Sequence, residues 1–319
     1  MIKEKYYNYK IVYFLILQFY LLFFSNKICI GISSEVKINV KRTEYPKILC
    51  VIFSHPTKET STLNHIIRTW LAHCDKALFI TTTGEKFHDK GEGGKKMRIE
   101  VIKISSEGGR MDILRKTIKS FKIIYSKFFN NTTKQEYDWL LKVNDNSFVV
   151  IENLKKFLKN KNKNENIYYG YNSNFNKINK KKLLNKKYIS GGSGYVISKN
   201  GIKNIFENKK NFLENCNEKI VNGYEDIIIG ICFKKLGIKG GNSRDENGFE
   251  TFLPPVVKKK YNLNLLKHEE MFNLFPGNKY ECQRMSQYPI SFHNIVSENF
   301  YILNYIFYKS KVNINIYNE

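Results

Sequence analysis

The sequence lacks several features that would mark particular classes of protein. Its six cysteines are too few for a small disulfide scaffold, and their spacing matches no metal finger, so zinc is not expected. Only one apolar segment could approach a bilayer, which excludes a multi-pass transporter. No internal repeat is visible. These absences indicate a globular chain with at most one membrane anchor.

Acidic residues are scarce as well. The chain has 29 Asp and Glu against 53 Lys and Arg, a formal net charge of +24. The lysines are spread along the chain together with abundant Asn, Ile, Tyr and Phe, a bias that an A/T-rich genome would produce. Neither a nucleic-acid-binding fold nor a concentrated basic face is visible, so no nucleic acid partner is expected. With 42% apolar and 14% aromatic residues, the chain can bury a large core.

The N-terminus sets the predicted compartment. Residues 11–24 form an apolar run interrupted only by Gln18, and three lysines precede it. Positive charge before the run predicts that the N-terminus stays cytosolic while the rest is translocated. We therefore expect residues 1–32 to be the cytosolic tail and signal anchor of a single-pass type II protein of the Golgi or endoplasmic reticulum membrane. The alternative is a signal peptide cleaved near Gly31–Ser34, which would give a secreted protein.

Beyond the anchor we expect a short polar stem over residues 33–45, one globular domain over 46–309 and a tail over 310–319. Strand-length apolar runs alternate with helical patterns, which indicates an α/β fold with a single, mostly parallel sheet flanked by helices. A surface excursion is expected around 172–187. The predicted strands are 48–54, 76–83, 99–104 and 139–143, and the predicted helices are 63–72, 111–129 and 225–237.

The strand predicted at 139–143 ends at the turn Asn144-Asp145-Asn146. Ligands of α/β folds bind at the ends of parallel strands, so this turn is the first candidate site. It could hold Mg²⁺ or Mn²⁺ against a diphosphate, because hard cations prefer oxygen ligands. An ordinary Asn/Asp turn after a strand explains the same residues.

Eight motifs follow one another along the chain. They are ILCVIFS at 48–54, IIRTWLAHCDKALFIT at 66–81, GGRMDILRKTIKSF at 108–121, DWLLKVNDNSFVVIENL at 138–154, YISGGSGYVIS at 188–198, YEDIIIGIC at 224–232, GGNSRDENGFETFLP at 240–254 and ISFHNI at 290–295. In this order they resemble the inverting β1,3-glycosyltransferases of GT-A fold, and most closely the core 1 β1,3-galactosyltransferase (T-synthase) group. Each motif alone is weak, whereas eight in order are specific.

The resemblance implies an activity and its partners. The implied reaction transfers galactose from UDP-galactose to GalNAc on Ser/Thr of mucin-type O-glycoproteins, in β1,3 linkage. A related β1,3-transferase that uses another UDP-sugar is an alternative. A homodimer or a chaperone partner is also possible in this group.

The resemblance also assigns donor-binding residues. It places Arg68 and Trp70 near the nucleotide and two further cations near the diphosphate, and an Arg fork matches phosphate geometry. Glycines in the fifth motif would allow close backbone approach to a ligand. Without the resemblance, Trp70 could be a core anchor, Arg68 a surface charge and the glycines a plain turn. The predicted donor-binding residues are Arg68, Trp70, Arg110, Lys116, Asp145, Gly191 and Gly192.

Glu225 and Asp226 precede an apolar stretch of helical length, so both would lie in a first helical turn, where the helix dipole favours negative charge. Helix capping explains this pattern by itself. The resemblance instead identifies Asp226 with the catalytic base that deprotonates the acceptor hydroxyl, with Glu225 as a supporting acceptor-site group.

The acidic turn departs from the family pattern, which is Asp-Asp-Asp or Asp-x-Asp. The usual metal-binding Asp corresponds to Asn146, whose amide oxygen carries no charge and should bind a cation more weakly. The resemblance implies a Mn²⁺ (or Mg²⁺) site of Asp145, Asn146 and His293, weakened or lost by this change. A catalytically silent folding partner for an active transferase is therefore the second hypothesis.

The cysteines suit a lumenal domain. Cys50 and Cys74 match a disulfide of the family, and Cys216 and Cys232, which flank the Glu225-Asp226 motif, are the second predicted pair. Cys282 is expected to be unpaired. Overlapping glycosylation sequons begin at Asn130 and Asn131, although such short patterns arise by chance in an Asn-rich chain.

Overall fold

The computed structural model describes residues 45–54, 59–84, 99–105, 110–130, 136–174, 187–207, 224–253 and 285–310. The chain divides into two units, Met1–Glu44 and Tyr45–Glu319, and every described residue belongs to the second unit. The predicted anchor over residues 1–32 therefore lies outside the described residues. Within the described ranges, no helix is long and apolar enough to cross a membrane.

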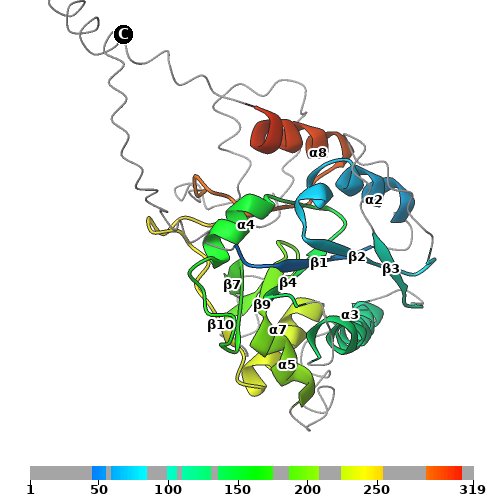
Figure 1. The fold of residues 1–319 in the computed structure, drawn as a ribbon, viewed down its shortest axis with the longest axis vertical. Helices are drawn as coiled ribbons and strands as arrows, with labels where there is room; N and C mark the ends of the chain where they lie inside the picture. Colours follow the sequence, from blue (N-terminus) through cyan, green and yellow to red (C-terminus); the bar gives the residue numbers. More distant parts are fainter. Residues whose placement is uncertain are drawn as a thin grey trace, which may run out of the picture. The chain divides into compact units, whose positions relative to one another are not determined.

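Strands and helices alternate along the described chain, as the sequence predicts (Figure 1). The strands are β1 (Ile48–Phe53), β2 (Lys76–Thr81), β3 (Glu100–Lys103), β4 (Trp139–Asn144), β5 (Ser147–Val149), β6 (Ile167–Gly170), β7 (Asn172–Asn174), β8 (Lys187–Ile189), β9 (Tyr195–Ser198), β10 (Lys239–Gly240), β11 (Phe252–Leu253) and β12 (Ser291–His293). The α-helices are α2 (Glu59–Ile67), α3 (Arg110–Ile124), α4 (Ile151–Leu158), α5 (Lys199–Glu207), α7 (Glu225–Lys235) and α8 (Ser297–Asn304). The described residues also form the short helices η1 (Trp70–His73), η2 (Tyr125–Phe129) and η8 (Tyr305–Lys309).

The central sheet has seven strands in the order β10-β6-β9-β4-β1-β2-β3. Strands β1, β2, β3 and β4 pair in parallel, but β9 runs antiparallel to both β4 and β6. Two smaller sheets, β11-β12-β5 and β7-β8, accompany it. The central sheet is thus mostly parallel, as predicted, because only β9 runs against its other strands, but the two small sheets correct the prediction of a single sheet. Strand β9 carries no sequence signal of its direction, which depends on how the chain returns to the sheet.

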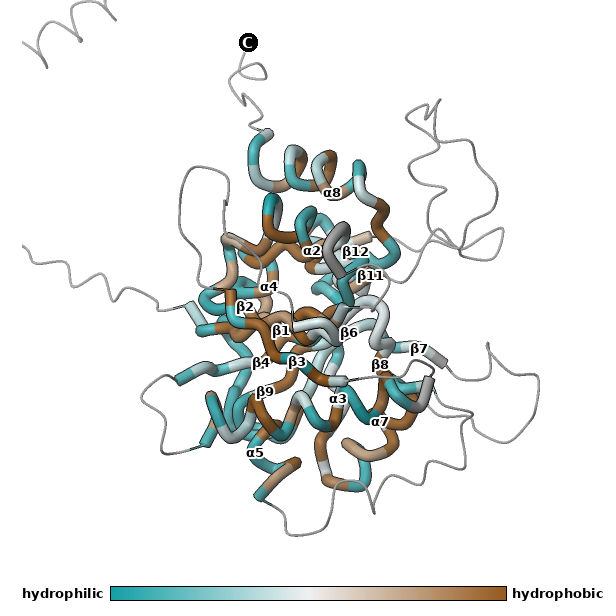
Figure 2. The backbone as a smooth tube through the Cα atoms, turned by 90° about the vertical axis from the view of Figure 1, so that its right-hand side faces the viewer, coloured by the Kyte–Doolittle hydropathy of each residue, from teal (hydrophilic) through white to brown (hydrophobic). Residues whose placement is uncertain are grey.

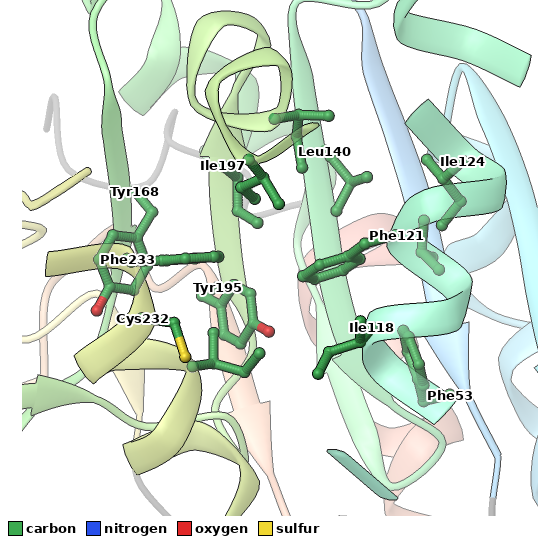
Figure 3. Packing of buried hydrophobic residues seen from close by; sticks show 14 of the residues in the cluster. Phe53, Ile118, Phe121, Ile124, Leu140, Tyr168, Tyr195, Ile197, Cys232 and Phe233 are labelled. Carbon is green, nitrogen blue, oxygen red and sulfur yellow. The ribbon is translucent and has the colours of Figure 1, made fainter. Parts of the chain in front are cut away.

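Two hydrophobic clusters pack against the two faces of the central sheet. Side chains of β1 alternate between them: Leu49, Val51 and Phe53 join one cluster, and Ile48, Cys50 and Ile52 join the other. Helices α3, α5 and α7 cover the first face and α2, α4 and α8 the second (Figure 1). Figure 3 shows α3 and α7 contributing Phe121 and Phe233 to the first cluster. Because helices bury both faces, the central strands β1 and β2 carry the hydrophobic colour in Figure 2.

The first predicted helix, 63–72, is displaced in the structure. Helix α2 begins at Glu59 and ends at Ile67, and the chain resumes as the short helix η1 at Trp70. Thr69 lies between them with φ −124° and ψ −105°, outside the helical region. Its hydroxyl donates to the carbonyl oxygen of His65 at 2.6 Å. This local hydrogen bond competes with the helix and explains the break.

One predicted disulfide is confirmed. Cys50 of β1 is bonded to Cys74, which follows η1, and their Cα atoms are 6.2 Å apart. Cys232 of α7 is buried and disulfide-bonded, but its predicted partner Cys216 lies outside the described residues. The pairing of Cys216 with Cys232 therefore stays a prediction.

Candidate functional site

The acidic turn lies where β4 ends and is held by the end of β1. Asp145 donates its backbone N–H to the carbonyl oxygen of Phe53 at 3.0 Å. Its Oδ2 accepts a hydrogen bond from Ser54 Oγ, also at 3.0 Å, and its exposed fraction is 7%. The parallel pairing of β1 with β4 brings these residues together, although 91 positions separate them in the sequence.

Trp70 packs beside this turn and donates a hydrogen bond to the residue that follows it. The indole is fully buried, and its Nε1 donates to the carbonyl oxygen of Ser147 at 3.2 Å. In this structure Trp70 is thus a core anchor beside the acidic turn. Arg68 is exposed and follows the end of α2. Burial and, to a smaller extent, the charge of Arg68 lower the pKa of His65 on that helix. No described contact connects Arg68 to the acidic turn.

The other two cationic residues predicted to bind the nucleotide-sugar donor, Lys116 and Arg110, lie on α3. The Lys116 ammonium is buried and donates to the carbonyl oxygen of Ser54 at 2.8 Å, so it reaches the strand end beside Asp145. Arg110 begins α3, and its side chain lies outside the described residues.

His293 reaches the acidic turn through the small sheet. Strand β12 pairs antiparallel with β5, and His293 lies opposite Ser147, the residue after Asn146. Burial and, to a smaller extent, the charge of Lys142 lower the pKa of His293 to about 4. The imidazole is therefore neutral near pH 7 and has a lone pair to offer.

A glycine loop lies between this imidazole and the carboxylate pair. A Cβ atom on Gly192 would lie 2.4 Å from His293 Cε1, and one on Gly191 would lie 3.0 Å from Asp226 Cβ. Ser147 Oγ donates to the carbonyl oxygen of Gly192 at 3.2 Å and ties the loop to the acidic turn. Side chains at either glycine would displace these neighbours, so the close packing explains both residues.

The carboxylate pair begins α7, as the sequence predicts. Asp226 accepts hydrogen bonds from the backbone N–H groups of Gly191 and Ile227, both at 3.0 Å. Burial, followed by the charge of Glu225, raises the pKa of Asp226, against the lowering effects of Gly191 and Lys142. Glu225 Oε1 is buried without a hydrogen-bond partner. The site thus presents a carboxylate whose proton affinity is above normal.

Lys142 also belongs to this cluster, although the sequence did not predict it as a site residue. Lys142 of β4 has an exposed side-chain fraction of 2%, and its ammonium lies 3.4 Å from Glu225 Oε2. The available signal was a lysine inside the apolar strand WLLKVN, because a lysine is rarely fully buried unless it is paired.

Two of the three residues predicted to bind the metal have a buried ligand atom without a hydrogen-bond partner. Asn146 Oδ1 and His293 Nδ1 are both buried without a hydrogen-bond partner, a state that costs about 1–3 kcal/mol for each group. Amide oxygen, carboxylate oxygen and neutral imidazole nitrogen are all cation ligands. No group of three or more His, Cys, Asp or Glu side chains suited to a metal occurs among the described residues, in keeping with asparagine at position 146.

The fold and the residues described above define an α/β protein with a candidate ligand site at the carboxyl ends of its central parallel strands. There an acidic turn, a glycine loop, a carboxylate pair and a histidine converge. The Fringe-like family model matches residues 56–310, and the chain belongs to the Fringe-like family.

A curated relative supports the same group. Over 267 residues the chain is 28% identical to glycoprotein-N-acetylgalactosamine 3-beta-galactosyltransferase 1 of Xenopus laevis, which covers 82% of this chain and 66% of that protein. Together with the family match, this confirms the resemblance to the core 1 β1,3-galactosyltransferase group. Among solved structures, the galactosyltransferase LgtC in complex with donor and acceptor sugar analogs aligns with a TM-score of 0.44 and 13% identity, over 82% of this chain and 97% of that one. At that TM-score the likeness carries no argument about function.

Proposed function

We propose that the chain is an inverting β1,3-glycosyltransferase that moves a sugar from a UDP-sugar to a glycoprotein acceptor. The observation that carries the proposal is the convergence of Asp226 and His293 on the Gly191-Gly192 loop beside the acidic turn. Family membership and the galactosyltransferase relative support the reaction class. Galactose as the sugar and GalNAc on Ser/Thr as the acceptor follow from the relative's name, and another UDP-sugar is the alternative.

In the proposed reaction, Asp226 accepts the proton of the acceptor hydroxyl. The acceptor oxygen forms a bond to the anomeric carbon as the bond from that carbon to the UDP oxygen breaks, and UDP leaves with the electron pair. The raised pKa of Asp226 strengthens it as a base, and its two backbone hydrogen bonds hold the carboxylate in place. Glu225 Oε1 has no hydrogen-bond partner, so it can accept a hydrogen bond from a second hydroxyl of the acceptor sugar.

Asp145, Asn146 and His293 would hold the divalent cation, Mn²⁺ or Mg²⁺. Such a cation neutralises the charge that develops on the leaving diphosphate. Ser54 orients Asp145, and Trp70 supports the turn through Ser147. Lys116 lies beside the same strand end and adds positive charge where the diphosphate would bind.

The proposed compartment is the lumen of the endoplasmic reticulum or Golgi. The Cys50–Cys74 disulfide supports it, because disulfides persist in oxidising compartments. The membrane anchor over residues 1–32 belongs to the same proposal and rests on the sequence alone.

A second candidate is a non-catalytic folding partner for an active transferase. Asn146 favours it, because this residue stands where a metal-binding carboxylate is usual in the group and leaves the turn with a single acidic residue, Asp145. Retention of Asp226 and His293 in one cluster favours the enzyme.

The test is a transfer assay of the purified full-length protein. A panel of UDP-sugars is combined with a GalNAc-bearing peptide, with Mn²⁺ or with a chelator, and products are identified by mass spectrometry. We expect the peptide to gain one hexose from UDP-galactose in the presence of Mn²⁺, and Asp226→Asn to lower the rate of product formation by about 10²–10⁴-fold. Absence of transfer from every donor, combined with co-purification of a transferase that is unstable alone, would establish the folding partner instead.

A further inference from the structure

Lys142 is an interior lysine that joins two parts of the site. Its ammonium lies 3.3 Å from Asn144 Oδ1 at the acidic turn and 3.4 Å from Glu225 Oε2 in the carboxylate pair. Lys142 and Glu225 are 83 positions apart, and their side chains are 2% and 9% exposed. The lysine therefore spans the interior between β4 and α7.

The surroundings of this ammonium are aromatic. The ring centroids of Phe53 and Tyr195 lie 5.2 Å and 5.5 Å from Lys142 Nζ, and both rings appear in Figure 3. Water is largely excluded, so the attraction between the ammonium and a carboxylate is stronger here than at the surface. A buried charge persists only when it is paired, and Glu225 supplies that pair.

Glu225 acts on Asp226, and the charge of Asp226 in turn contributes to raising the pKa values of three tyrosines, Tyr168 of β6, Tyr188 of β8 and Tyr195 of β9. Burial raises the pKa of each tyrosine above its ordinary value, so all three are neutral near pH 7. Among the described residues, Lys142 is thus the cation that faces this pair of carboxylates.

We propose that Lys142 is a positioning residue that holds Glu225 in place and compensates the charge of the carboxylate pair, so that Asp226 is the carboxylate that takes the acceptor proton. The inference rests on the proposed function in so far as Asp226 is the base. Two adjacent buried carboxylates repel each other, and one of them binds a proton when no cation compensates. Without Lys142, a proton held by the pair removes the base from the reaction.

The first experiment is the pH profile of kcat/KM for the full-length protein. Lys142→Met should move the acid limb upward by about one pH unit or more, with about a tenfold loss of kcat/KM below the new limb. Glu225→Gln leaves the ammonium facing Asp226 alone and should move the limb downward. Lys142→Met combined with Glu225→Gln removes both charges and should return the limb toward its wild-type position. The matched control is Lys155→Met, which removes an ion-paired lysine from α4 and should leave the limb unchanged.

The second experiment needs no transfer activity. Carboxyl NMR of protein labelled with carbon-13 aspartate follows the titration of Asp226, assigned by its loss in Asp226→Asn. The pKa of Asp226 should rise in Lys142→Met and fall in Glu225→Gln. A uniform loss of activity with an unmoved limb and an unmoved Asp226 titration would reduce Lys142 to a structural role and overturn the proposal. If Lys142→Met does not fold, the Glu225→Gln and double variants decide by the same readouts.

The two experiments separate this inference from the proposed function. If the wild-type protein transfers no sugar, the proposed function fails. The carboxyl titration of Asp226 then still shows whether Lys142 controls the protonation of the carboxylate pair. If transfer occurs and neither readout moves, only the role of Lys142 is wrong.

Discussion

Gly192 packs against the imidazole of His293, so closely that a Cβ atom on the glycine would be 2.4 Å from His293 Cε1 and 2.6 Å from Nδ1. The neighbouring Gly191 makes the corresponding contact with Asp226. A single dipeptide therefore separates the proposed metal-binding histidine from the proposed base. The distance between His293 and Asp226 therefore depends on having glycine, which has no side chain, at both positions.

Gly192→Ala should displace His293 and reduce transfer. The added methyl cannot share the space of the ring, so the imidazole must move away from the acidic turn. We expect kcat/KM to fall by about 10- to 100-fold and the Mn²⁺ concentration for half-maximal activity to rise. Gly240→Ala is the control, because its Cβ would meet nothing closer than 3.5 Å. Full activity of Gly192→Ala would show that the position of His293 does not matter for transfer.

Asp226→Asn should remove the base while it preserves size. General-base catalysis contributes about 10²–10⁴-fold, and kcat should fall by that factor while UDP affinity, measured by calorimetry, changes little. Asp112→Asn on α3 is a control, because that carboxylate forms an ion pair with Arg115 outside the cluster. Near wild-type turnover of Asp226→Asn would remove this residue from the mechanism.

Asn146→Asp should strengthen the metal site. A carboxylate adds a negative charge where the amide oxygen is buried without a partner. The Mn²⁺ concentration for half-maximal activity should fall by about tenfold or more, and Asp145→Asn should weaken UDP binding. If Mn²⁺ affects neither activity nor UDP affinity in the wild type or in Asn146→Asp, the metal-dependent mechanism is wrong.

The stability of the metal-free protein should depend on the protonation of His293. Its pKa is lowered from 6.5 to about 4, so acid favours the unfolded chain, which binds the proton more readily. This contribution to the free energy of unfolding is complete above pH 6.5 and is lost as the pH falls toward 4. Urea unfolding across this range should show a shallower pH dependence for His293→Gln than for wild type. Parallel pH curves for the two proteins would contradict the buried neutral histidine.

Loss of the Cys50–Cys74 disulfide should lower the free energy of unfolding of the domain and leave the candidate site unchanged. The Cys50–Cys74 bond closes a loop with a sequence separation of 24, for which the loop-entropy relation gives about 3.5 kcal/mol. Denaturant unfolding of Cys50→Ala combined with Cys74→Ala should show that loss, and reduction of the wild type should cost at least as much, because it also breaks the disulfide of Cys232. Free thiols at both positions in protein taken from its native membranes would contradict the lumenal compartment.

Much of the fold was predictable because its signals are local. The apolar runs at 48–54, 76–83 and 139–143 match β1, β2 and β4 to within two residues, since strands buried on both faces read as continuous apolar stretches. The predicted helix beginning at Glu225 matches α7, which ends at Lys235. By contrast, the antiparallel strand β9 and the two small sheets were missed, because pairing partners lie far apart in the chain.

By itself, the sequence pointed to most of the candidate site residues through the order of its motifs, although it did not point to Lys142. Only the tertiary structure decided how they meet: the Gly191-Gly192 loop between His293 and Asp226, Trp70 beneath Ser147, and Lys142 between the turn and Glu225. Motifs encode residue types at short spacing, whereas these contacts join positions from 35 to 101 apart along the chain. Packing of the sheet and its helices brings such positions together, and that packing depends on the whole chain at once.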